Sequence, residues 1–191
     1  MGRLFSAEEY NPEGYLKDWA QTIYNPMYKK AVSYLPHELG RVADIGCGIG
    51  NIAKWMRKAG YEISQYLGVD FSEKMIAKAK ELNPGFEFIV GDIYDQDTQE
   101  VITGCDVWMM LEFLEHVRDD VEVIRGVPSG KSLILSVPNY NSQSHVRWFK
   151  DKKAVTQKYG EFVRFEDSQT FVISKRKRIF AFKATKKMKG A

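Results

Sequence analysis

The stretch from Val42 to Gly50, VADIGCGIG, decides the fold of this 191-residue chain. Residues 41–45 are mostly apolar and predict a buried strand, and glycines at every second position after Asp44 predict a tight turn. Apolar residues at helical spacing follow, and Gly60 stands where a helix-terminating glycine is expected. Strand, glycine turn and helix open a nucleotide-binding βαβ unit, because the start of the helix offers free N–H groups to a ligand.

Two kinds of nucleotide fit this turn. Gly48-x-Gly50-x-x-Ala53, with Asp70 about 20 residues further on, matches a dinucleotide fingerprint. Asp44 favours a different ligand, since a carboxylate at the strand end would repel a pyrophosphate. It would attract the ammonium and sulfonium groups of S-adenosylmethionine (SAM). An NAD(P)-dependent oxidoreductase and a plain βα turn remain as alternatives.

The motif Asp44-x-Gly46-x-Gly48-x-Gly50 resembles the first motif of class I SAM-dependent methyltransferases. The resemblance covers roughly residues 20–185. It is closest to the small-molecule branch that includes ubiquinone-biosynthesis-type O-methyltransferases, through Leu-Glu-His-Val at 114–117 and Ser-Val-Pro-Asn at 136–139. It implies SAM as cofactor, S-adenosylhomocysteine as product, and methyl transfer to an O or N atom of a small-molecule acceptor.

The periodicity predicts five alternating βα units closed by a β hairpin. We expect a Rossmann-like, doubly wound, mostly parallel seven-stranded sheet with an antiparallel C-terminal hairpin, in one domain over residues 1–191. Within residues 1–40 we expect helices after Asn11-Pro12 and after Asn25-Pro26, each asparagine being the N-cap. The resemblance implies that residues 1–40 form a helical cap over the cleft. The expected strands are 41–45, 65–70, 86–90, 105–111, 131–137, 159–167 and 171–184.

Acidic and apolar side chains at the strand ends form the expected cofactor site. Asp70 suits the two ribose hydroxyls, and Asp92 suits the adenine amino group or else N-caps a helix over 95–101. Phe71 and Met75 either flank the adenine or belong to the core. The full set of expected cofactor contacts is Asp44, Gly46, Cys47, Gly48, Gly50, Asp70, Phe71, Met75, Asp92, Ile93, Leu111 and Glu112.

A second group of titratable residues follows the fourth expected strand. We take His116, Glu115 and His145 as the candidate catalytic residues, because imidazole titrates close to neutral pH and can serve as a general base. Glu112, Glu115 and His116 with a later histidine also resemble the metal site of small-RNA 3′-end 2′-O-methyltransferases. A metal-assisted RNA 2′-O-methyltransferase is therefore an alternative. No metal ligand is assigned, because Leu-Glu-His is common in methyltransferases without a metal.

Charge and cysteine content bear on partners and location. Residues 147–191 hold 14 lysines and arginines against four acidic residues. This excess suits an acidic substrate or RNA, or else a solvated hairpin whose lysines protect a sheet edge, and we favour the second interpretation. No apolar run is long enough to span a membrane and no secretory leader is evident, so a cytoplasmic protein is expected. A non-catalytic SAM-binding module remains a further alternative.

Overall fold

A computed structural model describes residues 23–188 of the chain, so the helix expected after Asn11-Pro12 lies outside the described residues. The described residues fall into two compact units, 23–107 and 108–188, which are taken here in turn.

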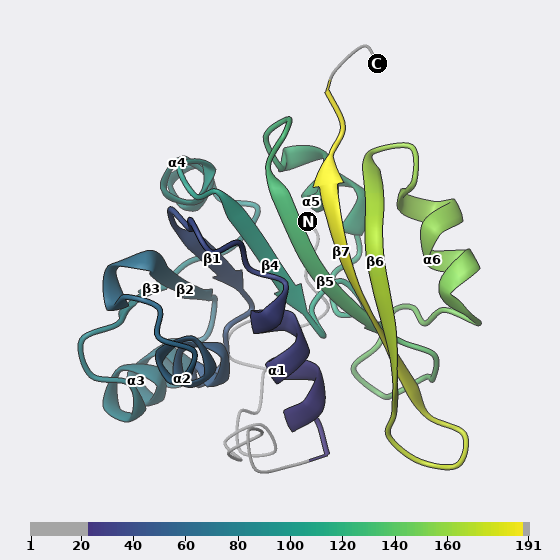
Figure 1. Ribbon diagram of the computed structural model, residues 1–191, viewed down its shortest axis with the longest axis horizontal. Coiled ribbons are helices and arrows are strands. Elements are labelled where there is room, and N and C mark those ends of the chain that lie inside the picture. Colours follow the sequence, from purple (N-terminus) through teal and green to yellow (C-terminus); the bar gives the residue numbers. More distant parts are fainter. Residues whose placement is uncertain (1–22, 189–191) are drawn as a thin grey trace. The chain divides into compact units, whose positions relative to one another are not determined.

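The predicted architecture is confirmed: the chain carries a seven-stranded, mostly parallel sheet with antiparallel C-terminal strands (Figure 1). The strands are β1 Val42–Ile45, β2 Tyr66–Asp70, β3 Glu87–Val90, β4 Val107–Leu111, β5 Ser132–Pro138, β6 Val163–Val172 and β7 Arg178–Lys186. The α-helices among the described residues are α1 Asn25–Ser33, α2 Asn51–Lys58, α3 Glu73–Leu82, α4 Gln96–Thr103, α5 Asp120–Gly126 and α6 Lys152–Tyr159.

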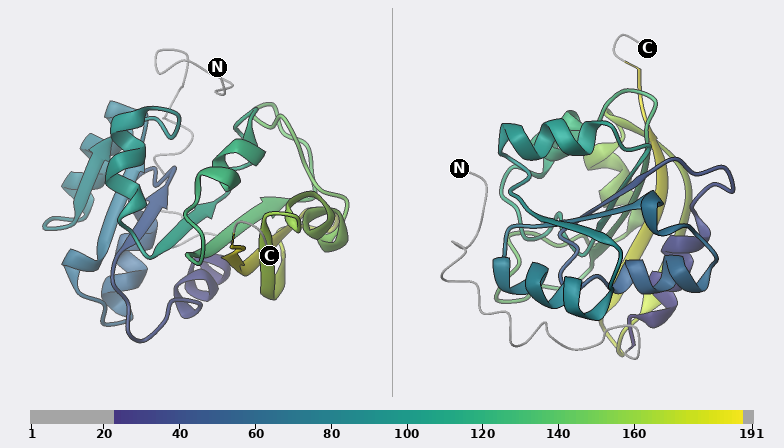
Figure 2. Two further views of the ribbon diagram at one scale, coloured as in Figure 1. Left: turned by 90° about the horizontal axis from the view of Figure 1, so that it is seen from above. Right: turned by 90° about the vertical axis from the view of Figure 1, so that its left-hand side faces the viewer.

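In the first unit, β1, β2 and β3 pair in parallel in the order β3-β2-β1. Every residue of β1 and β2 is buried, as expected for parallel strands that are covered on both faces. Ser72 N-caps α3 by accepting a hydrogen bond from the amide of Met75. α1 packs against α2 (Figure 2, right). The N-cap of α1 is Tyr24, so the expectation that Asn25 caps this helix is wrong: Asn25 is already helical.

The second unit is built on β5, which pairs antiparallel with β7, while β7 pairs antiparallel with β6. The hairpin therefore forms as predicted, but β6 begins at Val163 and runs through Phe171 and Val172, which had been expected in the last strand. β6 starts later in the sequence than expected because α6 continues to Tyr159, whose hydroxyl donates to Asp120 of α5. The segment between β5 and α6 contains no helix.

Candidate functional site

The glycine turn is held against the end of β2. The amides of Gly46 and Cys47 both donate to the carbonyl of Val69, at 2.8 and 3.0 Å. Gly48 and Gly50 have left-handed φ angles of 53° and 76°. A Cβ on Gly50 would lie 2.7 Å from atoms of neighbouring side chains, whereas a Cβ on Gly48 would meet nothing within 4 Å. Gly48 therefore exposes its main chain to open space, which allows a ligand to approach closely.

Asp70 braces this turn as well as ending β2. Its Oδ2 accepts a hydrogen bond from the amide of Gly48 at 3.0 Å, and its Oδ1 accepts one from the amide of Ser72 at 2.9 Å. Burial raises the pKa of Asp70, and these two hydrogen bonds oppose that effect. Each carboxylate oxygen keeps a further lone pair, so the ribose contact remains chemically feasible.

Asp44, at the end of β1, is 3% exposed and accepts a hydrogen bond from the Tyr66 hydroxyl at 2.7 Å. Burial and, to a lesser extent, the charge of nearby Asp70 raise its pKa to about 7, while the hydrogen bond from Tyr66 opposes this shift. No cationic side chain among residues 23–188 contributes to the pKa of either carboxylate. Two buried acids beside an open glycine turn fit a cationic ligand, since its charge would offset the burial cost of theirs. The residues present therefore fit the methionine end of SAM.

The remaining predicted contacts of this unit lie close to the same strand ends. Cys47, Met75 and Ile93 are buried, and Met75 is only 1% exposed, which agrees with a core position. Asp92 accepts a hydrogen bond from the amide of Tyr94. The N-cap of α4 is Asp95, so the alternative of Asp92 as that N-cap is wrong. Adenine contacts by Phe71, Met75, Asp92 and Ile93 stay predictions.

In the second unit, Leu111 ends β4 and Glu112 follows with a φ of 51°. Glu112 is the only described residue other than glycine with a positive φ. Ser136 on β5 holds this conformation, because its hydroxyl accepts from the Glu112 amide and donates to Oε1 of the same residue, each at 2.9 Å. Burial raises the pKa of Glu112 to about 7. Strained backbone of this kind concentrates at functional sites.

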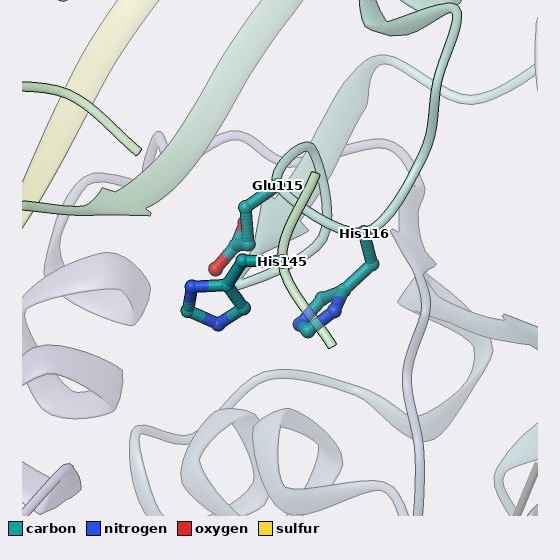
Figure 3. Close-up of side chains that lie close together, drawn as sticks. All are labelled: Glu115, His116 and His145. Atoms are coloured by element: carbon teal, nitrogen blue, oxygen red, sulfur yellow. The ribbon is translucent and has the colours of Figure 1, made fainter. Parts of the chain in front are cut away.

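Glu115, His116 and His145 come together although they lie in two separate segments (Figure 3). One ligand atom from each, a carboxylate oxygen or a ring nitrogen, lies within 4.8 Å of the others. Glu115 is 0% exposed, and neither of its carboxylate oxygens has a hydrogen-bond partner. Burial raises the pKa of Glu115 well above its ordinary value, and the charge of Glu112 adds to this. The structure thus brings together all three predicted catalytic residues.

Both imidazoles are oriented by backbone carbonyls. Nδ1 of His116 lies 2.8 Å from the Ser144 carbonyl, and Nδ1 of His145 lies 3.1 Å from the Tyr140 carbonyl. A carbonyl can only accept, so each Nδ1 carries the proton and each Nε2 keeps its lone pair. Burial lowers the pKa of His116 to about 4 and also lowers that of His145. Two neutral imidazoles and a carboxylate, each imidazole held by an outer hydrogen bond, are a ligand set that suits a divalent transition metal.

Two residues with clear roles at this cluster were not singled out from the sequence. Ser136 holds the backbone conformation of Glu112. Its Ser-Val-Pro-Asn segment contributed to the family resemblance, but no role was assigned to Ser136 from the sequence. Arg147 donates to the carbonyls of Leu114, Val117 and Arg118 and so fastens the loop that carries His145. Its only sequence signal is its position two residues after His145.

Comparison with known proteins agrees with these features. Residues 42–127 match the family model described as a methyltransferase domain. The ubiquinone biosynthesis O-methyltransferase of Pseudomonas aeruginosa is 33% identical over 113 residues, which cover 56% of this chain and 47% of that protein. The chain thus aligns with about half the length of the curated relatives it matches.

Two solved structures share the fold. The structure of a complex between the Haloferax volcanii Trm112 methyltransferase activator and a putative methyltransferase aligns with a TM-score of 0.68 at 15% identity, covering 89% of this chain and 93% of the other. Magnesium protoporphyrin IX methyltransferase from Synechocystis, with bound SAM, gives 0.63 at 16% identity, covering 94% and 98%.

A mostly parallel sheet with a glycine turn between acidic strand ends defines the class I methyltransferase fold. Residues 42–127 therefore match a methyltransferase domain, and the chain shares the fold of solved SAM-dependent methyltransferases. No helix among the described residues combines the length and apolar character needed to cross a membrane.

Proposed function

We propose that this protein transfers the methyl group of SAM to a hydroxyl oxygen of a small-molecule acceptor, with a divalent cation held by Glu115, His116 and His145. The observation that carries the proposal is the Glu115 carboxylate, fully buried and without a hydrogen-bond partner. A buried carboxylate is costly unless a cation or a proton compensates its charge. Two imidazole nitrogens within 4.8 Å provide the other ligands that a cation would need.

The reaction needs little covalent help from the protein. In an SN2 displacement the acceptor oxygen forms a bond to the methyl carbon as the carbon–sulfur bond breaks, S-adenosylhomocysteine leaves, and the hydroxyl proton passes to water. A divalent cation, when bound, makes a hydroxyl more acidic. Asp44 and Asp70 bind the cofactor in this proposal, and Glu115, His116 and His145 orient the acceptor hydroxyl. Without a metal, a neutral imidazole would remain as the general base.

We propose that residues 1–191 work as a single methyltransferase domain. We also propose a reducing, cytoplasmic location, which is supported by the two buried cysteines, Cys47 and Cys105, neither of which forms a disulfide.

Chelation tests the metal. Protein treated with a chelator and then freed of it is incubated with SAM and a panel of catechols and other hydroxyl compounds, and S-adenosylhomocysteine is measured with and without magnesium, manganese or zinc. We expect activity only after one of these ions is returned. Glu115→Gln should prevent this recovery, while Glu161→Gln, at an exposed position, should not. Full activity of the chelated protein would exclude the metal and leave the imidazole as base.

A further inference from the structure

The turn between β6 and β7 carries exposed positive charge close to the cluster of Glu115, His116 and His145. Lys175, Arg176 and Lys177 are all exposed there. No acidic residue forms an ion pair with any of them in the part of the chain that the structure describes. Their charge is therefore available to a ligand.

The turn is fixed in place. Asn139, just after β5, donates from its amide to the carbonyl of Arg178 at 3.0 Å and accepts at Oδ1 from the amide of Arg178 at 2.6 Å. Nδ2 of Asn139 donates to the carbonyl of Arg176. The Arg178 guanidinium donates to carbonyls within the turn, including that of Ser174 at 2.9 Å. The three exposed cations are thus presented by a pinned turn at the carboxyl end of β5.

A chain of ring contacts connects these charges to the cluster. The Lys177 ammonium lies 4.6 Å from the centre of the Tyr140 ring. The Tyr140 ring lies 5.6 Å from that of His145, and the His145 ring lies 5.0 Å from that of His116. One aromatic ring therefore separates the cationic turn from a residue of the candidate acceptor site.

Protection of a sheet edge does not explain these charges. The edge strand of this unit is β6, and β7 lies between β5 and β6. Lys175 to Lys177 stand beyond the strand ends, where they cannot block pairing along an edge. The interpretation favoured from the sequence, that the lysines of the hairpin protect a sheet edge, therefore does not apply to the turn.

We infer that the acceptor is a small hydroxyl compound carrying a phosphate or a carboxylate, and that Lys175, Arg176 and Lys177 bind this anionic group while the hydroxyl lies at the Glu115, His116 and His145 cluster. The inference rests on the proposed function. Charge-assisted hydrogen bonds from lysine and arginine suit both anions, and arginine can bind either in a bidentate manner.

Binding to the full chain loaded with S-adenosylhomocysteine tests this inference without depending on methyl transfer. Four probes are titrated by calorimetry at low salt: catechol, 3,4-dihydroxybenzoate, 3,4-dihydroxybenzylphosphonate, and an eight-nucleotide single-stranded RNA. We expect at least one of the two small anions to bind tenfold or more tightly than catechol. The stronger of the two identifies the anionic group.

The variant K175Q/R176Q/K177Q should lose this advantage and keep the affinity for catechol. The matched control K74Q/K80Q/K153Q removes the same charge at exposed positions elsewhere and should keep the advantage. Equal binding of catechol and both anions, no binding of either anion, an unchanged advantage in the first variant, or tightest binding of the RNA would each overturn the inference. If Glu115→Gln keeps full activity while the anion preference persists, the proposed metal fails and the anion site stands.

Discussion

Arg147 and Asp120 form a buried ion pair, with 3.2 Å between Nη2 and Oδ1 and side chains only 17% and 4% exposed. The Tyr159 hydroxyl donates to the other oxygen of Asp120 at 2.6 Å. Arg147 in turn holds backbone carbonyls around Glu115, and the amide of the preceding Val146 donates to the Glu115 carbonyl at 2.8 Å. The pair therefore fixes the loop carrying His145 to the segment carrying Glu115.

Arg147→Gln should lower the free energy of unfolding by about 3 kcal/mol, because it removes the ion pair with Asp120 and the hydrogen bonds to three backbone carbonyls. Lys158, whose ammonium lies 3.3 Å from Oδ2, remains as the other cationic partner of Asp120. Tyr159→Phe should cost only about 1 kcal/mol, the usual contribution of one hydrogen bond. Urea denaturation measures both. Equal losses in the two variants would contradict the role assigned to Arg147.

Gly48→Ala should weaken SAM binding at least tenfold, since its Cβ would enter the open space proposed for the cofactor. Gly60→Ala is the matched control: both glycines have a positive φ, and an added Cβ at either meets nothing within 4 Å. Both variants should lose about 1 kcal/mol of stability from backbone strain. Calorimetry with SAM distinguishes them, and equal SAM affinity in the two would place the cofactor elsewhere.

As part of the proposed SAM site, Asp44 should make SAM binding depend on pH. Its pKa is raised to about 7 in the folded protein, so it is largely protonated below that pH, whereas a cationic ligand favours its charged form. SAM binding at pH 6 should therefore release a proton, and SAM affinity should rise as pH increases to about 7. Calorimetry in two buffers with different ionisation enthalpies measures the release. Asp44→Asn should abolish it and weaken binding by roughly 1.5–3 kcal/mol.

The raised pKa of Asp44 also makes the stability of the ligand-free protein depend on pH. Stability should fall as pH increases, whereas SAM affinity should rise. Between pH 4 and 7 the folded state binds more protons at Asp44 than the unfolded state does, so this residue lowers stability as pH rises. The neutral His116 acts in the other direction over part of that range, because its pKa is lowered to about 4. Thermal melts of wild type and Asp44→Asn should therefore differ least near pH 4 and most near pH 7. A difference independent of pH would contradict the buried, uncompensated carboxylate.

Glu115→Gln should leave the metal-free protein as stable as wild type or more stable at pH 7.5, because it removes a fully buried carboxylate whose ionisation burial disfavours. Wild type should gain thermal stability on addition of zinc or manganese, by the stabilisation that any ligand of the folded state provides. The variant should lose most of that gain. A metal-induced shift of equal size in both proteins would show that the ion binds elsewhere.

Local sequence patterns were sufficient for the glycine turn of the first unit, but not for the N-cap of α1. The glycine spacing predicted the turn, and the position of Asp44 and Asp70 at the ends of apolar strands predicted two buried carboxylates beside it. These features depend on residues close to one another in the chain or on parallel strand ends, which the topology brings to one edge.

The cluster in the second unit could be only partly predicted. Nothing near His145 in the sequence indicates that its ring lies beside His116, because that contact depends on Arg147, Val146 and Tyr140 in a loop without regular structure. The start of β6 was misplaced for a similar reason: Tyr159 is held in α6 by a hydrogen bond to Asp120, a partner 39 residues away. Contacts between distant segments decide such positions, and periodicity contains no information about them.

Glu112 places an acidic side chain where the backbone favours glycine. Left-handed backbone costs a residue with a Cβ roughly 1–2 kcal/mol, and here that cost falls on a residue whose charge is also disfavoured by burial. A glycine at this position would relieve the backbone strain and remove the carboxylate. The fold is therefore less stable at this position, and the Glu112 carboxyl is held in one orientation before any ligand binds. A directed-evolution experiment that selects only for heat resistance should replace Glu112 before other residues.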